Sequence, residues 1–343
     1  MSAWIEQAYK LLQGINDINL RMMLGNQLIL YYMWIGDLAK VRLLVQQLQP
    51  IGKKSEVPPL ARLMWFSMDA QYAWLTNDTK ACESSVQAGL KVARDSGVHH
   101  WDFHLFSHGV YGSLTAGNLP TAVQYLRRME AVLNPGRFLD VSQYHYLAAW
   151  EASVRGNVRQ ALEHANTSLA LAQKAGSPYP AAVVKISLAQ LLYENGEYAK
   201  AARYLADTHR YARKIKSMYL NFVCLMAEAY LALERGLERI GLRLLRKAMA
   251  LGKQQGYVNF PWCRFSVITY LCVTALEADI EVDYAQKLVR CRRLTPKTPP
   301  VNIKNWPWPI KIFTLGKFSL IKDGNHFLFQ EKLRKNPWKC LRH

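Results

Sequence analysis

Three histidines in the first third of the chain have the spacing of metal ligands on a helix. His100, His104 and His108 follow one another at intervals of four residues, so a helix would place them on one face. With His99 and Asp102 nearby, this group has the side chains that ligate zinc. The same segment is rich in aromatic and apolar residues, and no further ligand stands at metal spacing. We therefore interpret these histidines as core and groove residues and predict no metal site.

Other combinations of residues that support catalysis are missing. The sequence has no H-E-x-x-H helix, no nucleophile elbow, no paired acids and no glycine-rich dinucleotide loop. It has no G-x-x-x-x-G-K-S/T loop either, because Gly316-Lys317 lacks a glycine at the required upstream spacing. We predict that the protein is not an enzyme and that it binds no cofactor of its own. The six cysteines are scattered and are interpreted as reduced, structural residues.

Positive charge is concentrated near the C-terminus. The net charge of the whole chain is +19, and residues 287–343 contribute +12 of it, from 14 basic and 2 acidic side chains. Such a tail attracts polyanions whatever its fold, because neutralising phosphates releases counterions. We predict nonspecific nucleic-acid contact by the last basic residues: Lys332, Arg334, Lys335, Lys339 and Arg342. The alternative is that part of this charge only improves solubility.

A second group of basic residues lies earlier in the chain. Arg203, Arg210, Arg213, Lys214 and Lys216 have helical spacing. This spacing favours a solvated helix face over an anion-binding site.

The elements that position these residues repeat with a period of about 40. A Gly or Asn marks a turn at each step, at Gly36, Asn77, Gly117, Gly156, Gly196 and Gly236. Four of the turns are followed directly by a short polar residue that caps the next helix: Asp37, Asp78, Asn118 and Asn157. Glu197 favours a fifth helix start. We predict an all-α, right-handed superhelix of tetratricopeptide-like hairpins, in which stacked copies share one core.

Two further positions recur in each repeat. Five residues after each turn stands a small or slim residue, which lets the two helices of a hairpin approach closely: Val41, Cys82, Ala122, Ala161, Ala201 and Gly241. Aromatic residues gather just before the turns: Tyr31, Tyr32, Trp34, Tyr72, Trp74, Tyr111, Trp150, Tyr193 and Tyr230. We expect most of them to pack between repeats and a minority to line the concave surface. The sequence does not indicate which of these aromatic residues belong to which group.

Prolines indicate where the hairpins are joined and where the array ends. Breaks between pairs are predicted at Pro50, Pro58, Pro59, Asn134-Pro135-Gly136, Pro178, Pro180 and Pro261. A seventh, atypical turn is predicted at Asp279, where Tyr284 replaces the small residue. The segment Trp4 to Leu12 has helical spacing and no first helix of its own, so the chain is expected to start inside a hairpin.

After Arg293 the pattern changes. Five prolines between Pro296 and Pro309 exclude a helix and predict an extended linker. Alternating apolar residues from Ile310 onward, broken by Asp323-Gly324, predict the strands of a short β-meander. The predicted division is a helical-repeat domain over residues 1–294, a proline-rich linker over 295–309 and a short β fragment over 310–343.

Several passages resemble a known family, the helical-repeat regulatory region of large ATP-dependent bacterial transcriptional activators of the MalT-like and LuxR types. The passages are Cys82 with Ala88-Gly89-Leu90, Ser96-Gly97-Val98-His99, Trp101-Asp102-Phe103, Tyr144-His145-Tyr146-Leu147, Ile280-Glu281-Val282-Asp283-Tyr284 and Arg292-Arg293-Leu294-Thr295-Pro296. The run Trp306-Pro307-Trp308-Pro309-Ile310, with Thr314-Leu315-Gly316, is similar to the start of the OmpR-like winged helix of antibiotic-regulator (SARP-type) activators. The resemblance implies that residues 1–294 are a regulatory domain and that residues 310–343 are the incomplete N-terminal part of a winged-helix DNA-binding domain.

This resemblance implies an architecture of NTPase module, superhelix and DNA reader, in which an effector bound to the superhelix controls nucleotide-dependent assembly. The chain departs from it at both ends, since it has neither a phosphate-binding loop nor a recognition helix before His343. ATP is therefore expected only in a full-length relative that carries the NTPase module. DNA is expected as a partner only in a complete regulator.

The sequence thus predicts an effector-sensing or protein-binding module of a bacterial transcription regulator, which binds a protein or a small effector in its concave groove. A free-standing protein-interaction scaffold, a sequence-independent nucleic-acid binder and a nonfunctional fragment stay open as alternatives. No signal peptide opens the chain and no apolar run is long enough to cross a bilayer, so we predict a cytoplasmic protein without membrane partners.

Overall fold

Helices account for most of the described chain. The computed structural model describes residues 2–262, 264–296, 298–303, 305–313, 319–322 and 325–327. Its helices are α1 (Ser2–Gly14), α2 (Ile18–Ile35), α3 (Leu38–Gly52), α4 (Pro59–Leu75), α5 (Thr79–Ser96), α6 (Asp102–Thr115), α7 (Leu119–Ala131), α8 (Phe138–Val154), α9 (Val158–Lys174), α10 (Pro178–Glu194), α11 (Tyr198–Lys214), α12 (Met218–Glu234), α13 (Glu238–Gln255), α14 (Phe265–Glu277) and α15 (Val282–Arg292).

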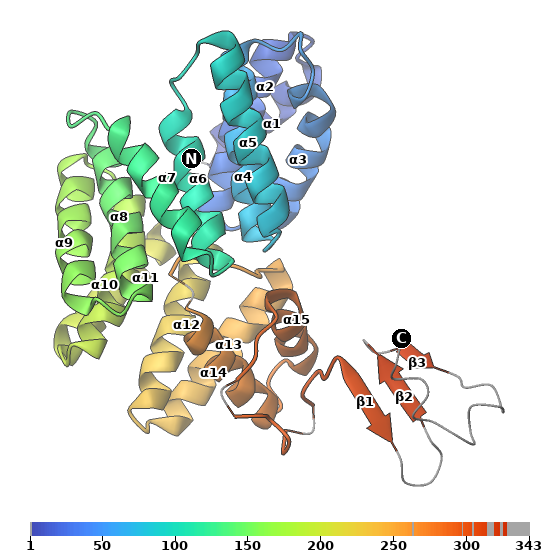
Figure 1. The fold of residues 1–343 in the computed structure, drawn as a ribbon, viewed down its shortest axis with the longest axis vertical. Coiled ribbons are helices and arrows are strands. Elements are labelled where there is room, and N and C mark those ends of the chain that lie inside the picture. Colours follow the sequence, from blue (N-terminus) through green and yellow to red (C-terminus); the bar gives the residue numbers. More distant parts are fainter. Residues whose placement is uncertain are drawn as a thin grey trace.

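Helix α1 precedes seven hairpins that wind into a superhelix (Figure 1). Each even-numbered helix from α2 to α14 packs against the odd-numbered helix that follows it. Successive even-numbered helices also pack on one another from α2 to α8 and from α10 to α14, and α9 packs on α10 between these two rows. The prediction of an all-α superhelix of tetratricopeptide-like hairpins is confirmed.

Every predicted hairpin turn has the backbone conformation that its residue type favours. All six turn residues from Gly36 to Gly236 have a positive φ, and so does Asp279 at the seventh turn. Glycine and asparagine tolerate this left-handed region better than other residues do. The four predicted caps also form, for example where the Ala81 N–H donates to the Asp78 carboxylate over 2.9 Å. Glu197 precedes α11 without a capping hydrogen bond from its side chain.

The predicted small residues lie at the contact between the two helices of each hairpin. Val41, Cys82 and Ala122 are fully buried. At Gly241 a Cβ would lie only 2.5 Å from Leu233 of the preceding helix, so glycine is needed there. Tyr284 of the seventh hairpin is also buried, and its hydroxyl donates to the Tyr257 carbonyl over 2.6 Å.

The predicted proline breaks lie between the pairs or, like Pro180 of α10, in the first turn of a helix, with one exception. Pro59 and Pro178 are the first residues of α4 and α10, where a missing N–H costs no helical hydrogen bond. The prediction that Pro50 marks a break is wrong, because Pro50 lies inside α3, two residues before its end. A proline there removes only one hydrogen bond from the last turn, which the helix tolerates.

Three short strands follow the last hairpin: β1 (Ile310–Phe313), β2 (Ser319–Lys322) and β3 (Asn325–Phe327). They form an antiparallel sheet in the order β1-β2-β3, in which Ile310 pairs with Lys322 and Lys322 with Asn325. The predicted meander is therefore present, while residues 314–318 and the predicted Asp323-Gly324 turn lie outside the described residues. Figure 1 shows the sheet beyond α15, at the edge of the superhelix. The division of the chain into three domains stays a prediction.

None of the helices in the described part of the chain combines the length and the hydropathy needed to cross a membrane.

Candidate functional site

The superhelix completes one turn and encloses a cavity. Helix α12 packs against α2, five hairpins earlier in the chain, so the first helices of six hairpins surround a common interior. This interior holds a cavity of about 310 Å³ lined by side chains of α2, α4, α6, α8, α10 and α12. A volume of this size is at the lower end of that of sites for small ligands. The hairpins far apart in the sequence thus contribute to one site.

Aromatic side chains form much of the cavity wall. The lining includes Trp34, Trp74, Trp101, Tyr111, Tyr146, Tyr179 and Tyr219. Trp34 of α2 stacks on Tyr179 of α10, with ring centroids 4.7 Å apart and planes at 8°, so an aromatic pair joins the two sides of the cavity. Trp34, Trp74 and Tyr111 belong to the aromatic residues predicted to precede the turns. The expectation that a minority of that set lines the concave surface agrees with these positions.

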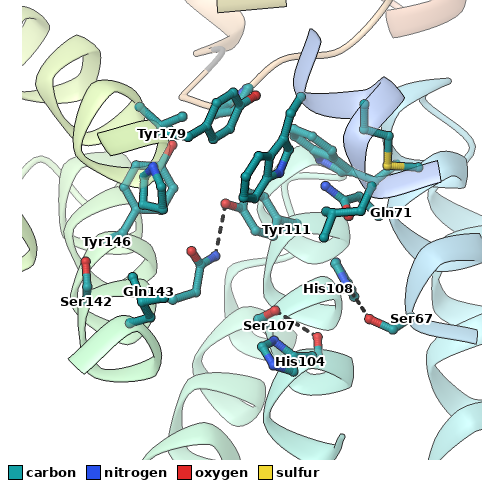
Figure 2. Close-up of a pocket in the computed structure, with 18 of the residues that line it drawn as sticks. Ser67, Gln71, His104, Ser107, His108, Tyr111, Ser142, Gln143, Tyr146 and Tyr179 are labelled. Carbon is teal, nitrogen blue, oxygen red and sulfur yellow. Dashed lines mark hydrogen bonds between the residues drawn. The ribbon is translucent and has the colours of Figure 1, made fainter. Parts of the chain in front are cut away.

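A few polar groups are set among the rings (Figure 2). The Gln143 Nε2 of α8 donates to the Tyr111 hydroxyl of α6 over 3.1 Å, and the Ser67 Oγ of α4 lies 2.9 Å from His108 Nε2. Gln71 of α4 also lines the cavity. Each of these polar groups comes from an inner helix, so their relative positions depend on how neighbouring hairpins stack.

The cavity is close to electrically neutral at pH 7. Burial lowers the pKa of His108 to about 3 and also lowers the pKa of His104, so both imidazoles are uncharged. Burial raises the pKa of Tyr111 to about 12, which keeps its hydroxyl protonated. Asp140 is the one carboxylate among the described lining residues, and the Arg137 Nε lies 2.9 Å from it. The cavity therefore offers neither a free cation nor an uncompensated anion to a ligand.

A buried connection closes one side of this interior. Residues 257–262, here called the inner strap, link α13 to α14, and most of their side chains are fully buried. The Tyr257 hydroxyl donates to the Gly36 carbonyl at the end of α2 over 2.7 Å. The Asn259 side chain donates to the Trp74 carbonyl at the end of α4 over 3.0 Å. The inner strap thus ties the last hairpins to the first two, and its Pro261 is part of the cavity wall.

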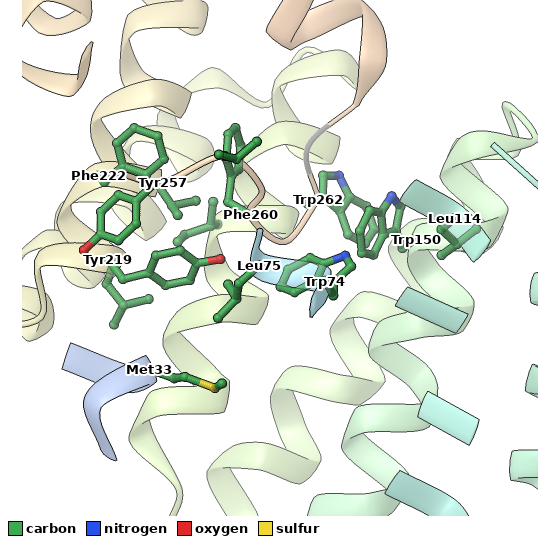
Figure 3. Close-up of a cluster of buried hydrophobic side chains, with 14 of the residues drawn as sticks. Met33, Trp74, Leu75, Leu114, Trp150, Tyr219, Phe222, Tyr257, Phe260 and Trp262 are labelled. Carbon is green, nitrogen blue, oxygen red and sulfur yellow. The ribbon is translucent and has the colours of Figure 1, made fainter. Parts of the chain in front are cut away.

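Aromatic packing fixes the same strap on its other side (Figure 3). Trp262 lies against Trp150 of α8, with centroids 6.2 Å apart, and against Tyr146. At the other end of the strap, Tyr257 contacts Tyr219 and Phe222 of α12. A buried loop is unusual because its backbone groups need partners, and here the ends of the inner helices and side chains of the core supply several of them.

The three histidines predicted from their spacing do not converge on one point. His108 is buried against Ser67, His104 lines the cavity, and His100 is exposed before α6 begins. In the part of the chain that the structure describes, no three His, Cys, Asp or Glu side chains are grouped as they would be around a metal ion. The interpretation as core and groove histidines is confirmed for His104 and His108 and is wrong for His100, which lies before the helix.

The other residues named from the sequence have different outcomes. Lys332, Arg334, Lys335, Lys339 and Arg342 lie outside the described residues, so their nucleic-acid contact stays a prediction. Cys82, Cys224 and Cys272 are buried on helices, and Cys291 is exposed. Burial raises the pKa of the Cys82 thiol to about 12, as expected for a structural cysteine.

Sequence reasoning missed Gln71, Gln143, Tyr146, Tyr179 and the inner strap as parts of the site. For Gln71 and Gln143 a weak signal existed, because each lies on the cavity-facing side of the first helix of its hairpin, where a polar side chain interrupts apolar residues. Nothing in the local sequence marks the strap, since its partners at Gly36 and Trp74 are about 200 residues away.

Comparison with known proteins yields structural matches only. No protein-family model matches the chain, and no curated protein matches it. Among solved structures, the chain is similar to a Rap protein complexed with competence and sporulation factor, with a TM-score of 0.56 and 10% identity over 80% of this chain and 77% of that one. It is equally similar to NprR in complex with its cognate peptide NprX, with a TM-score of 0.56 and 15% identity over 84% and 82%.

A third similar structure is a signal-transduction ATPase with numerous domains and a tetratricopeptide repeat sensor, from Pyrococcus horikoshii. Its TM-score is 0.52 and its identity 16%, and the match covers 82% of this chain and 42% of that protein. At these identities the three similarities establish the fold, a superhelix of tetratricopeptide-like repeats.

Proposed function

We propose that this chain is the effector-sensing module of a bacterial regulator, and that it binds a short peptide in the enclosed cavity. The observation that carries the proposal is the cavity itself, built from six inner helices and lined by aromatic rings with a few polar groups. Such a site buries apolar side chains and fixes their orientation through a small number of hydrogen bonds. Because its wall comes from several hairpins, an occupant contacts repeats that are far apart in the sequence.

The lining defines the chemistry of the peptide. Neutral imidazoles, protonated phenols and the Asp140–Arg137 pair leave no cation for a ligand carboxylate. Burying an unpaired charge in such a cavity is costly. We therefore expect the part of the peptide that enters to be an aromatic or aliphatic side chain, with Gln71 and Gln143 available to its backbone amides.

Two independent observations support a regulatory role. The NprR structure with a similar fold holds the peptide NprX, and the archaeal ATPase uses a tetratricopeptide repeat sensor. The transcriptional part of the proposal rests on the resemblance of the sequence to MalT-like and LuxR-type activators. A coupling mechanism follows from the inner strap, since a ligand that moves α2 or α4 also moves the strap and, through it, α14.

Calorimetric titration tests the proposal with a panel of heptapeptides blocked at both ends, each with one central Trp, Phe, Leu, Asp or Glu. We expect the peptides with an apolar centre to bind and those with an acidic centre to fail. Gln143→Leu should weaken binding by about tenfold, because an unpaired buried polar group costs about 1–3 kcal/mol. Gln49→Leu, at an exposed position of α3, is the matched control and should bind as the wild type does.

Two results would contradict the proposal. Preference for the acidic peptides, or equal affinity of the Gln143→Leu variant and the wild type for the apolar ones, would show that the cavity is not the binding site. Thermal melting of both variants separates loss of binding from loss of folding.

A further inference from the structure

A second surface of the protein lies on the opposite side of the repeats from the cavity. Residues 198–253, which form α11, α12 and α13, hold 12 basic and 4 acidic side chains. Their net charge of +8 accounts for all of the positive charge that the first 286 residues carry, since that whole segment has a net charge of +7. The first 286 residues are therefore close to neutral outside this part.

The charge lies on the outer helices and not between them. Helix α12 contains no basic residue, whereas α11 and α13 each contain five, and both helices pack on α12. Arg203, Arg210 and Lys214 follow at helical spacing along α11, as Arg239, Arg243 and Lys247 do along α13. All six are exposed. Helices α11 and α13 are the outer helices of neighbouring hairpins, and each carries a row of exposed cations. We call these two rows together the basic face.

Most of these cations have no acidic partner. Arg210 contacts Asp207 over 3.4 Å, and Lys200 and Lys253 pair with Glu197 and Glu281. The other cations of α11 and α13 make no ion pair with any residue in the described ranges; they are Arg203, Arg213, Lys214, Arg239, Arg243, Arg246 and Lys247. Seven such cations repel one another, and a polyanion would relieve that repulsion.

We propose that the basic face binds the phosphate backbone of double-stranded nucleic acid, without reading its sequence. Cations from Arg203 to Lys214 extend over about 16 Å at 1.5 Å per residue, a length along which a duplex presents a continuous series of phosphates. Five of the seven unpaired cations are arginines, whose planar guanidinium matches phosphate oxygens.

The composition between the cations favours nucleic acid over an acidic protein. Ala202, Ala206 and Ala250 occupy exposed positions among them, and the half-exposed large residues Tyr198, Leu237 and Ile240 lie where α11 and α13 begin. A protein interface needs large apolar anchors near its centre, whereas these three lie at the ends of the cation rows. The outer helix of the next hairpin, α15, packs on α13 and extends the surface with Lys287 and Arg290.

The test measures fluorescence anisotropy of a labelled 20-base-pair random duplex with the full chain, between 50 and 200 mM salt. The face variant carries Arg213→Gln, Lys214→Gln, Arg243→Gln and Arg246→Gln. The control variant loses the same charge from exposed positions of α5 and α9, through Lys80→Gln, Lys91→Gln, Arg94→Gln and Arg159→Gln. A third variant removes four cations of the tail, at Lys332, Arg334, Lys335 and Lys339.

We expect the face variant to lose at least about tenfold in affinity at 50 mM salt and the slope of log affinity against log salt to shrink by about 3, because each phosphate contact contributes about 0.9. The control variant should keep at least half of the wild-type affinity, and the sequence of the duplex should not matter. Equal losses in the face and control variants would overturn the proposal, as would a loss confined to the tail variant. It would also fail if the protein bound poly-glutamate or phosphatidylglycerol vesicles more tightly than the duplex. Native melting temperatures of all three variants establish that they fold.

Discussion

The inner and outer helices of the repeats differ in what surrounds them. Helices α10 and α11 belong to one hairpin and both have 17 residues, yet α10 buries ten of them and α11 only four. Helix α10 contacts the cavity, the preceding hairpin and the following one, whereas α11 has one buried face and one in water. A charged group is tolerated in water and is costly in the interior unless it is paired.

This difference separates two kinds of surface. The inner layer is aromatic and nearly neutral, which suits a ligand that is enclosed, and the outer layer of α11 and α13 is basic, which suits a partner that docks from solvent. The same repeat can carry both because the residues of its two helices are constrained independently. Three measurements on the folded protein test how far the two layers differ.

The largest effect is expected from removing a large side chain of the inner strap. Trp262 is 1% exposed and packs on Trp150, whereas Tyr198 at the start of α11 is 50% exposed. Trp262→Ala should lower the free energy of unfolding by about 3–5 kcal/mol, as expected for truncating a buried tryptophan. Tyr198→Ala should lower it by about 1 kcal/mol or less. Urea denaturation measures both values, and equal losses would show that the strap is not part of the core.

A smaller difference is expected between two turn glycines. Gly36 and Gly196 both have a left-handed backbone, with φ of +88° and +80°. A Cβ at Gly36 would lie 2.2 Å from the Tyr257 hydroxyl and 2.6 Å from the backbone nitrogen of Tyr219, whereas one at Gly196 would meet nothing within 4 Å. Gly196→Ala should therefore lower the free energy of unfolding by only about 1–2 kcal/mol, which is the cost of placing alanine in the left-handed region.

Gly36→Ala should cost more than this, because the strap and α12 must move to admit the methyl group. The comparison is made by chemical denaturation of the two variants in parallel. If the two substitutions destabilise the protein equally, the contact between the inner strap and the end of α2 does not contribute to stability.

The third prediction concerns pH and His108. Its pKa of about 3 in the folded protein is below the ordinary value of 6.5, so between these values the unfolded chain binds a proton that the folded chain does not. The contribution of His108 to stability is therefore fully present above about pH 6.5 and decreases as the pH falls, by up to about 1.4 kcal/mol per unit.

The difference in unfolding free energy between the wild type and His108→Gln, measured from pH 7.5 to pH 4.5, isolates this contribution. We expect the advantage of the wild type to shrink steadily as the pH falls. The control is Gln49→Leu at the exposed position of α3, which removes no titratable group and should leave the pH dependence unchanged. A constant difference between wild type and His108→Gln would contradict the neutral, buried imidazole.

Much of the fold follows from local chemistry. The turn at Asn77, the cap at Asp78 and the buried Cys82 lie within six residues of one another, and each is identified by its residue type and its place in the period. The error at Pro50 has the same local origin, because a proline in the last turn of a helix looks like a proline in a linker. The candidate site could be predicted only in part, since the sequence points to Trp34 and Tyr111 but not to Gln143 or Tyr179.

By itself, then, the sequence determined the hairpins, their period and their all-α class, because the residues that specify a turn or a cap are neighbours along the chain. The tertiary structure decided which aromatic side chains surround the cavity and how the strap seals it, since those contacts join hairpins as much as 221 residues apart. It also decided that α11 and α13, which carry the exposed cations, both pack on α12. The physical reason is that each hairpin buries only part of its own surface, so the rest depends on how the repeats stack.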